Sequence, residues 1–187
     1  LGFRIAIFSI SQPQSDWYSA IGIQNLRNSQ SVDAANSTVA KLGYLSLIQE
    51  LRKAITLFMP DLVHSHYASS YGLLGALTSF HPYIVSVWGS DVFAFPKESF
   101  IKKQILKFNL SRADAVFSTS KIMAIETAKY TSKKIDITPF GIDTKIFFPS
   151  DEKHSSITVG IIKSMEEKYG IPYLIEAFSN AVLKFPS

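Results

Sequence analysis

Residues 60–91 read PDLVHSHYASSYGLLGALTSFHPYIVSVWGSD, and this stretch decides the fold. It begins with a predicted strand at 61–65, continues with a glycine-containing helical segment at 71–80, and ends with an apolar run at 83–87, followed by WGSD. Short apolar runs bounded by turn residues are typical of buried strands. A strand, a helix and a second strand in this order predict a β-α-β unit, in which the two strands are parallel.

The same alternation of strand and helix continues on both sides of this unit. Further strands are predicted at 3–9, 115–118 and 135–138, and further helices at 17–26, 42–58, 100–110 and 121–130. In the helix at 100–110, helical spacing predicts that Ile101, Ile105 and Phe108 point inward. Strands that alternate with helices predict an α/β protein with a Rossmann-like parallel sheet and helices on both faces.

Candidate site residues follow the predicted strands at one edge of this sheet, where α/β proteins bind their ligands. His66 follows the strand at 61–65, and Trp88 and Asp91 follow the strand at 83–87. We expect His66 and Asp91 to be catalytic. Each residue also has a structural alternative: a histidine bonded to backbone, a tryptophan in the core, and an aspartate that caps a turn.

Several chemistries are excluded by missing motifs. The loop after the first strand, at 9–15, contains no glycine, which argues against a dinucleotide-binding loop, and no phosphate-binding loop motif occurs. There is no Asp-x-Asp pair to hold a divalent cation on a diphosphate, and there is no cysteine. We therefore expect no metal site.

Charge is unevenly distributed along the 187 residues. The net charge is +4, but residues 97–134 carry nine Lys or Arg and three Asp or Glu, a balance of +6. A solvated surface and an anionic partner both account for this stretch. Nucleic acid is the weakest of the anionic partners, because no nucleic-acid-binding motif is present. No apolar run reaches the roughly 20 residues that span a bilayer. We expect a cytoplasmic protein with peripheral membrane contact, through 97–134 or the amphipathic helix at 42–58.

Five segments of the chain resemble the GT-B glycosyltransferases of family 4. They are PDLVHSHY at 60–67, VWGSD at 87–91, SRADAVFSTS at 111–120, PFGID at 139–143 and ITVGIIKSMEEKYGIPYLIEAF at 157–178. The resemblance implies that residues 1–149 are a Rossmann-like acceptor-side domain, that 150–156 are a linker, and that 157–187 are the first strand, at 157–162, and the first helix of a truncated donor-binding domain.

The resemblance further implies a metal-independent, retaining sugar transfer in surface polysaccharide or glycolipid synthesis. A nucleotide sugar would be the donor, without a further cofactor, and the acceptor would be a saccharide or a glycolipid. Lys163 and Lys168 match the family's basic residues that bind the donor diphosphate. The residues that match the acceptor side are Ser11, Gln12, Tyr67, Trp88, Gly89 and Ser90. Trp88 stands where many members have histidine.

The family's paired glutamates on the donor sugar have no counterpart in this chain. We therefore expect a fragment that is inactive alone and that self-associates through its exposed apolar donor-side segment. A non-catalytic carbohydrate- or nucleotide-binding module is the alternative. A related sugar-nucleotide epimerase is disfavoured, because it needs more carboxylates and histidines than the predicted cleft carries.

Overall fold

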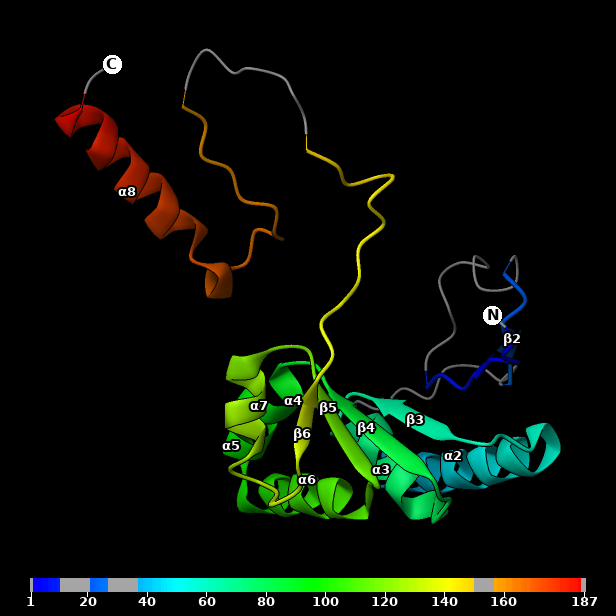
Figure 1. Ribbon diagram of the computed structural model, residues 1–187. Coiled ribbons are helices and arrows are strands. Elements are labelled where there is room, and N and C mark those ends of the chain that lie inside the picture. Colours follow the sequence, from blue (N-terminus) through cyan, green and yellow to red (C-terminus); the bar gives the residue numbers. More distant parts are fainter. Residues whose placement is uncertain (1, 11–20, 27–36, 150–156, 186–187) are drawn as a thin grey trace. The chain divides into compact units, whose positions relative to one another are not determined.

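The computed structural model describes residues 2–10, 21–26, 37–149 and 157–185 (Figure 1). The chain divides into two compact units, a first unit at Leu1–Gly141 and a second unit at Ile142–Ser187. The predicted linker at 150–156 lies outside the described residues, so the predicted domain boundaries stay a prediction. No helix of the described residues is long and apolar enough to cross a membrane.

A four-stranded parallel sheet forms the centre of the first unit. Its strands lie side by side in the order β3 (Val63–His66), β4 (Tyr83–Val87), β5 (Ala115–Ser118) and β6 (Ile135–Ile137). His66 pairs with Ser86, and Val87 pairs with Ser118, so the carboxyl ends of the strands are nearly level. The predicted α/β class with a parallel sheet is therefore confirmed, and β4 and β5 have the predicted bounds.

The helices of the first unit precede or connect the strands of this sheet. They are α2 (Ser37–Phe58), α3 (Ser70–Thr78), α4 (Ser90–Phe93), α5 (Phe95–Glu98), α6 (Phe100–Arg112) and α7 (Lys121–Thr127). Right-handed crossovers between successive parallel strands place their helices on one face of the sheet, where Figure 1 shows α3 and α6. On the opposite face His64 is exposed, and Ile84 and Phe117 are half-buried. The second helix layer stays a prediction for residues outside the described part of the chain.

The main core lies between the sheet and α6. Val85 and Val87 of β4 and Leu106 and Leu110 of α6 are completely buried there. Their packing follows from the alternation of a strand and the periodicity of a helix.

A second cluster of buried residues joins α2 to α3. It consists of Leu47, Ile48 and Leu51 of α2 and Leu74 of α3, with Phe8 and Ile10 packed against it. The apolar face of α2 is therefore covered by protein.

The predicted inward face of α6 is wrong. Ser99 caps the helix with its hydroxyl, which accepts a hydrogen bond from the Lys102 N–H, and fixes where α6 begins. Ile101 and Phe108 are 70% and 41% exposed. The helix instead buries Leu106, Asn109 and Leu110, because the Asn109 amide donates to the carbonyls of Ala68 and Ser69 in the loop before α3.

Two other predicted elements differ from the structure. The helix predicted at 17–26 is wrong at its end, since Gln24–Asn25 form strand β2, which pairs in parallel with β1 (Ala6–Ile7). Residues 17–20 lie outside the described residues. The strand predicted at 157–162 is absent, because these residues are exposed and pair with no strand among the residues that the structure describes. A strand requires a hydrogen-bonded neighbour.

The second unit contains a 3-10 turn and one long helix. The turn, η1, spans Glu167–Tyr169, and α8 spans Ile171–Lys184. Gly170 lies between them with a φ of 65°, a left-handed conformation that favours glycine. The predicted helix of this segment is thus present.

Candidate functional site

Asp91 holds together the loops that follow β3 and β4. Its side chain is completely buried. One carboxylate oxygen accepts the Ala68 N–H at 2.7 Å, the other accepts the Gly89 N–H at 2.7 Å, and the Trp88 N–H lies 3.1 and 3.2 Å from the two oxygens. These bonds satisfy three backbone donors that would otherwise be buried without a partner. The structure thus favours the structural alternative for Asp91, and its catalytic role stays a prediction.

The backbone around Asp91 adopts unusual conformations. Gly89 has a φ of 139°, which a residue with a side chain rarely adopts. Tyr67, at the end of β3, has a φ of 86°, and its hydroxyl meets the Ser90 hydroxyl at 2.5 Å. The structure therefore brings together Tyr67, Gly89 and Ser90, all predicted as acceptor-side residues.

A row of four rings runs along the carboxyl edge of the sheet. The centroids of the His64 and His66 rings are 4.1 Å apart, and the His66 ring meets the Trp88 ring edge to face at 5.5 Å. Trp88 meets Phe140 edge to face at 5.1 Å. Trp88 is 46% exposed and Phe140 is 65% exposed. Trp88 is therefore not a core residue, and the row presents ring surface to solvent.

Both histidines of this row are neutral near pH 7. Partial burial lowers the pKa of His64 from 6.5 to about 4, and the adjacent His66 ring adds to the effect. Burial also lowers the pKa of His66 below its ordinary value. The Nε2 atom of His64 lies 2.7 Å from the Ser86 hydroxyl, so this ring has a structural partner. The neutral His66 ring can both donate and accept a hydrogen bond at the strand end.

Sequence reasoning placed residues 140–143 at this edge without a role for the Phe140 ring, and it did not single out Tyr71. Phe140 lies beyond β6, and no local pattern indicates that its ring meets Trp88. Tyr71 of α3 receives the Ile10 N–H on its hydroxyl at 3.1 Å, and that hydroxyl lies 3.3 Å from the Ser9 hydroxyl. Tyr71 thus holds the chain just before the predicted acceptor residues Ser11 and Gln12, which lie outside the described residues.

The donor-side candidates belong to the second unit. The Lys163 ammonium lies 5.2 Å from the centroid of the Tyr169 ring, a distance typical of a cation–π interaction. Lys168 is part of η1, but its side chain lies outside what the structure describes. The diphosphate role of both lysines stays a prediction.

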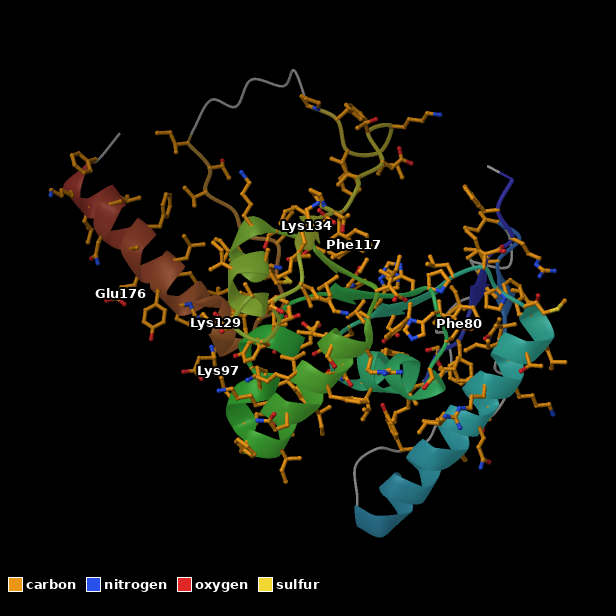
Figure 2. All side chains as sticks on the ribbon, turned by 60° about the horizontal axis from the view of Figure 1, so that its bottom comes forward. Phe80, Lys97, Phe117, Lys129, Lys134 and Glu176 are labelled. Atoms are coloured by element: carbon orange, nitrogen blue, oxygen red, sulfur yellow. The ribbon has the colours of Figure 1, made fainter. Side chains whose placement is uncertain are left out.

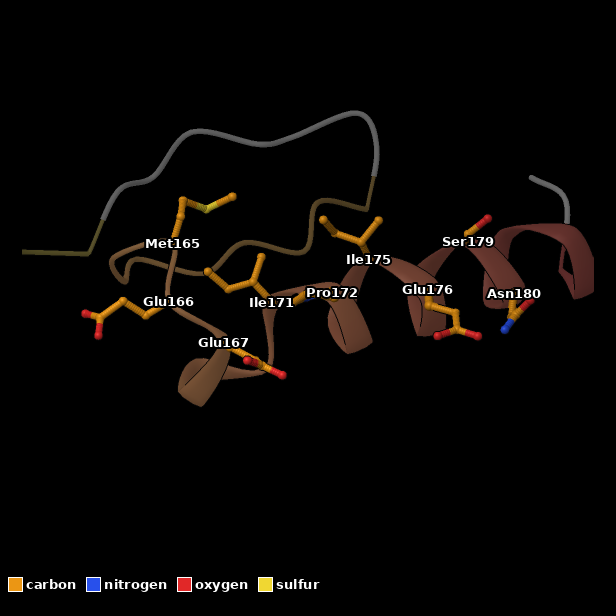
Figure 3. A pocket seen from close by; sticks show the side chains of 9 residues that line it. All are labelled: Met165, Glu166, Glu167, Ile171, Pro172, Ile175, Glu176, Ser179 and Asn180. Carbon is orange, nitrogen blue, oxygen red and sulfur yellow. The ribbon is translucent and has the colours of Figure 1, made fainter. Parts of the chain in front are cut away.

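A hollow of about 660 Å³ lies along α8 in the second unit (Figure 3). Its lining includes Ile171 and Ile175, and the carboxylates of Glu166, Glu167 and Glu176. Lys163 does not line it. Three carboxylates in the lining would repel a diphosphate.

Metal ligands do not cluster in the described part of the chain. No group of three or more histidine, aspartate or glutamate side chains is placed to hold a metal ion there.

The sequence profile of the glycosyl transferase 4-like family matches residues 2–120, which include β3, β4, β5 and the loops that carry His66 and Trp88. The chain belongs to this family. It is 24% identical over 128 residues to an uncharacterized glycosyltransferase of Methanocaldococcus jannaschii, a match that covers 67% of this chain and 35% of that protein.

It is also 29% identical over 101 residues to TuaC of Bacillus subtilis, named as a teichuronic acid biosynthesis glycosyltransferase, with 52% of this chain and 26% of TuaC covered. The chain thus spans about a third or less of the length of these two relatives.

Proposed function

We propose that the chain carries the acceptor-side part of a retaining, metal-independent glycosyltransferase. The full protein would move a sugar from a nucleotide sugar to a saccharide or lipid-linked acceptor in surface polysaccharide or glycolipid synthesis. The observation that supports this most is the solvent-facing row of His66, Trp88 and Phe140 at the carboxyl edge, in a chain of this family. Aromatic faces beside a few polar groups suit a sugar, which has apolar C–H faces and a rim of hydroxyls.

Each acceptor-side residue has a distinct role in this proposal. The exposed face of Trp88 stacks on the acceptor sugar, and the neutral His66 ring binds and orients the hydroxyl that will be glycosylated. The hydroxyls of Tyr67 and Ser90 form the polar rim beside it, together with Ser11 and Gln12. Asp91 is a positioning residue, because its carboxylate fixes the backbone of Trp88.

On the donor side, Lys163 and Lys168 bind the diphosphate. The acceptor oxygen forms a bond to the anomeric carbon on the face that the diphosphate leaves. The bond from that carbon to the diphosphate oxygen breaks, and the proton of the acceptor hydroxyl passes to that leaving oxygen. Negative charge develops on the leaving diphosphate, and the two cations stabilise it electrostatically. The nucleotide sugar is a substrate, so no further cofactor is required.

A transfer assay of the full-length protein with a panel of nucleotide sugars and acceptors tests this proposal. Activity should persist in EDTA. Trp88→Ala should raise the KM for the acceptor, whereas His66→Ala should lower kcat/KM by about tenfold or more, as expected when an orienting hydrogen bond is lost. Leu57→Ala, at the exposed end of α2, is the control and should change neither parameter. Transfer that is unchanged in both site variants would contradict the proposal.

The burial of Asp91 favours a second candidate, a carbohydrate- or nucleotide-binding module without turnover. A buried carboxylate that accepts three N–H groups is not accessible as a base. Saccharide binding by the full-length protein, without transfer from any nucleotide sugar, would support this candidate instead.

Self-association is a separate prediction for the second unit. Ile157, Ile162 and Leu183 are 88%, 99% and 79% exposed. Light scattering of the chain tests whether this apolar surface joins two copies.

A further inference from the structure

We propose that the solvent-facing side of α6 is a contact surface for an anionic lipid bilayer. Three large apolar side chains of this helix are exposed: Phe100 at 75%, Ile101 at 70% and Phe108 at 41%. These three residues are called the α6 apolar patch. Large apolar side chains exposed on the same side of a packed helix indicate an interaction surface.

The α6 apolar patch is a consequence of how the helix packs. At 100° per residue, Phe100, Ile101 and Phe108 lie on one side of the helix, and Leu106 and Leu110 lie on the other. The second side fills the core and is completely buried. Both sides of α6 are therefore apolar, and only one of them has a partner within the described residues.

The charges beside the patch select an anionic occupant. Lys103 and Lys107 are exposed, and no carboxylate of the described residues forms an ion pair with either. Their neighbours differ, since Lys102 pairs with Glu98, and Lys97 and Lys129, which are labelled in Figure 2, both pair with Glu126. The two lysines on α6 thus have no ion-pair partner among the described residues and can pair with an external anion.

Lipid fits this combination better than the other anionic partners. Three exposed apolar side chains that are not arranged to stack on bases would contribute little to the binding of nucleic acid. An interfacial helix, by contrast, inserts Phe and Ile into the acyl boundary while Lys side chains reach the headgroups. The balance of +6 over residues 97–134 adds attraction to a surface rich in anionic lipid.

The structure also distinguishes α6 from α2, the other helix that we predicted to contact a membrane. Leu47, Ile48 and Leu51 of α2 are buried against α3, so their apolar face could reach lipid only if the second cluster came apart. The α6 apolar patch reaches lipid without any change in the fold. The membrane contact therefore belongs to α6.

Vesicle co-sedimentation of the full chain tests the proposal. Vesicles of phosphatidylcholine alone are compared with vesicles that also contain phosphatidylglycerol, and binding should require the anionic lipid. Lys103→Gln with Lys107→Gln should lower the partition coefficient by about fivefold for each lysine. Phe100→Ser with Phe108→Ser should lower it by about tenfold or more.

Matched variants at the end of α2 provide the controls. Leu57 is 72% exposed, close to the value of Ile101, and Lys53 is exposed like Lys103. Leu57→Ser and Lys53→Gln should leave the partition coefficient unchanged, and circular dichroism should show that every variant is folded.

Four results would overturn the proposal. The first is no binding to anionic vesicles, and the second is equal binding to both kinds of vesicle. The third is binding that the control variants weaken as much as the α6 variants do. A change of oligomeric state in the Phe100→Ser and Phe108→Ser variant, seen by light scattering without a loss of vesicle binding, would assign the patch to a protein partner and overturn it too. The sugar-transfer proposal does not depend on this result, since its assay uses the variants of His66 and Trp88.

Discussion

Removing the Asp91 carboxylate should loosen the carboxyl edge of the sheet more than any other single polar substitution there. The side chain is completely buried and accepts N–H groups from Ala68, Trp88 and Gly89. Two of these belong to the loop after β4 and one to the loop after β3. Asp91 is therefore a buried polar link between these two loops, one of which follows His66 while the other carries Trp88.

The magnitude follows from the donors left behind. A buried polar group without a partner costs about 1–3 kcal/mol. Asp91→Ala leaves three N–H groups without this partner, and water can partly replace it at the Trp88 and Gly89 N–H groups, whose bonds are only partly buried. We therefore expect a loss of about 3–5 kcal/mol in the free energy of unfolding, which is a large share of the roughly 5–15 kcal/mol of a typical domain. Asp91→Asn keeps one oxygen but turns an NH2 group toward the other donors, so it should cost about 2 kcal/mol.

Urea unfolding followed by the fluorescence of Trp88 measures both values. Trp17 is first replaced by phenylalanine, so that Trp88 is the only tryptophan that reports. The emission of the folded Asp91→Asn variant should also shift, because the Trp88 backbone loses one of its anchors.

Asp136→Asn is the matched control for this substitution. Asp136 is 48% exposed and pairs only with Lys134, so its loss should cost less than about 1 kcal/mol. If Asp91→Asn were no more destabilising than Asp136→Asn, the role of Asp91 as the link between the loops would be refuted. Should Asp91→Ala fail to fold, the comparison of the two asparagine variants still decides.

Three further predictions concern packing, backbone strain and pH. Gly75→Ala should destabilise the chain by about 1–3 kcal/mol in urea unfolding, because its Cβ would lie 2.4 Å from the buried Tyr83 ring, whereas Gly72→Ala on the same helix meets only contacts of 3.5 Å or more and should be neutral or stabilising. Gly89→Ala has free space for a Cβ but a φ of 139°, so strain alone should cost about 1–3 kcal/mol, and an unchanged midpoint would show that the loop adapts. The native pKa of His64, about 4, is below its ordinary 6.5, so between pH 4 and 6.5 the unfolded chain binds more protons than the folded chain. The stabilisation that His64 contributes is therefore complete above pH 6.5 and is lost as the pH falls toward 4. A nuclear magnetic resonance titration of His64 with a midpoint at or above 6.5 would contradict the last prediction, and His64→Gln should flatten the pH dependence of unfolding.

The strands and most helices could be predicted because their signals are local. The apolar runs at 83–87 and 115–118 give the bounds of β4 and β5 directly. The strand β2 could not be predicted, because Gln24 and Asn25 have no strand pattern and depend on pairing with Ala6 and Ile7.

The face of α6 was predicted wrongly for a physical reason. Hydropathy counts Asn109 as a surface residue, but this asparagine is buried because its amide satisfies two loop carbonyls. Once Asn109 turns inward, Leu106 and Leu110 follow it, and Phe108 must turn outward. A single buried polar group thus overrides the apolar periodicity of the helix.

The sequence predicted where the candidate site residues lie, but it did not predict which contacts they make. The residue types after each strand indicated the carboxyl edge, and His66, Trp88 and Asp91 all lie there. Their roles depend on contacts between segments distant in the sequence. The Asp91 carboxylate is buried and accepts three backbone N–H groups, and the Phe140 ring meets the Trp88 ring edge to face. No local pattern contains this information.

The acceptor edge and the α6 apolar patch are linked through the chain that connects them. The loop after β4 carries Trp88, and it continues through α4 and α5 to the start of α6, where Phe100 and Ile101 are exposed. Helix α6 then runs back toward the amino ends of the strands. The patch therefore begins near their carboxyl ends, where the acceptor would bind. A bilayer held by this patch would present its headgroups to that side. If both proposals hold, a lipid-linked acceptor reaches Trp88 by diffusion within the membrane surface, and a soluble analogue of the same sugar should have a higher KM than the lipid-linked form.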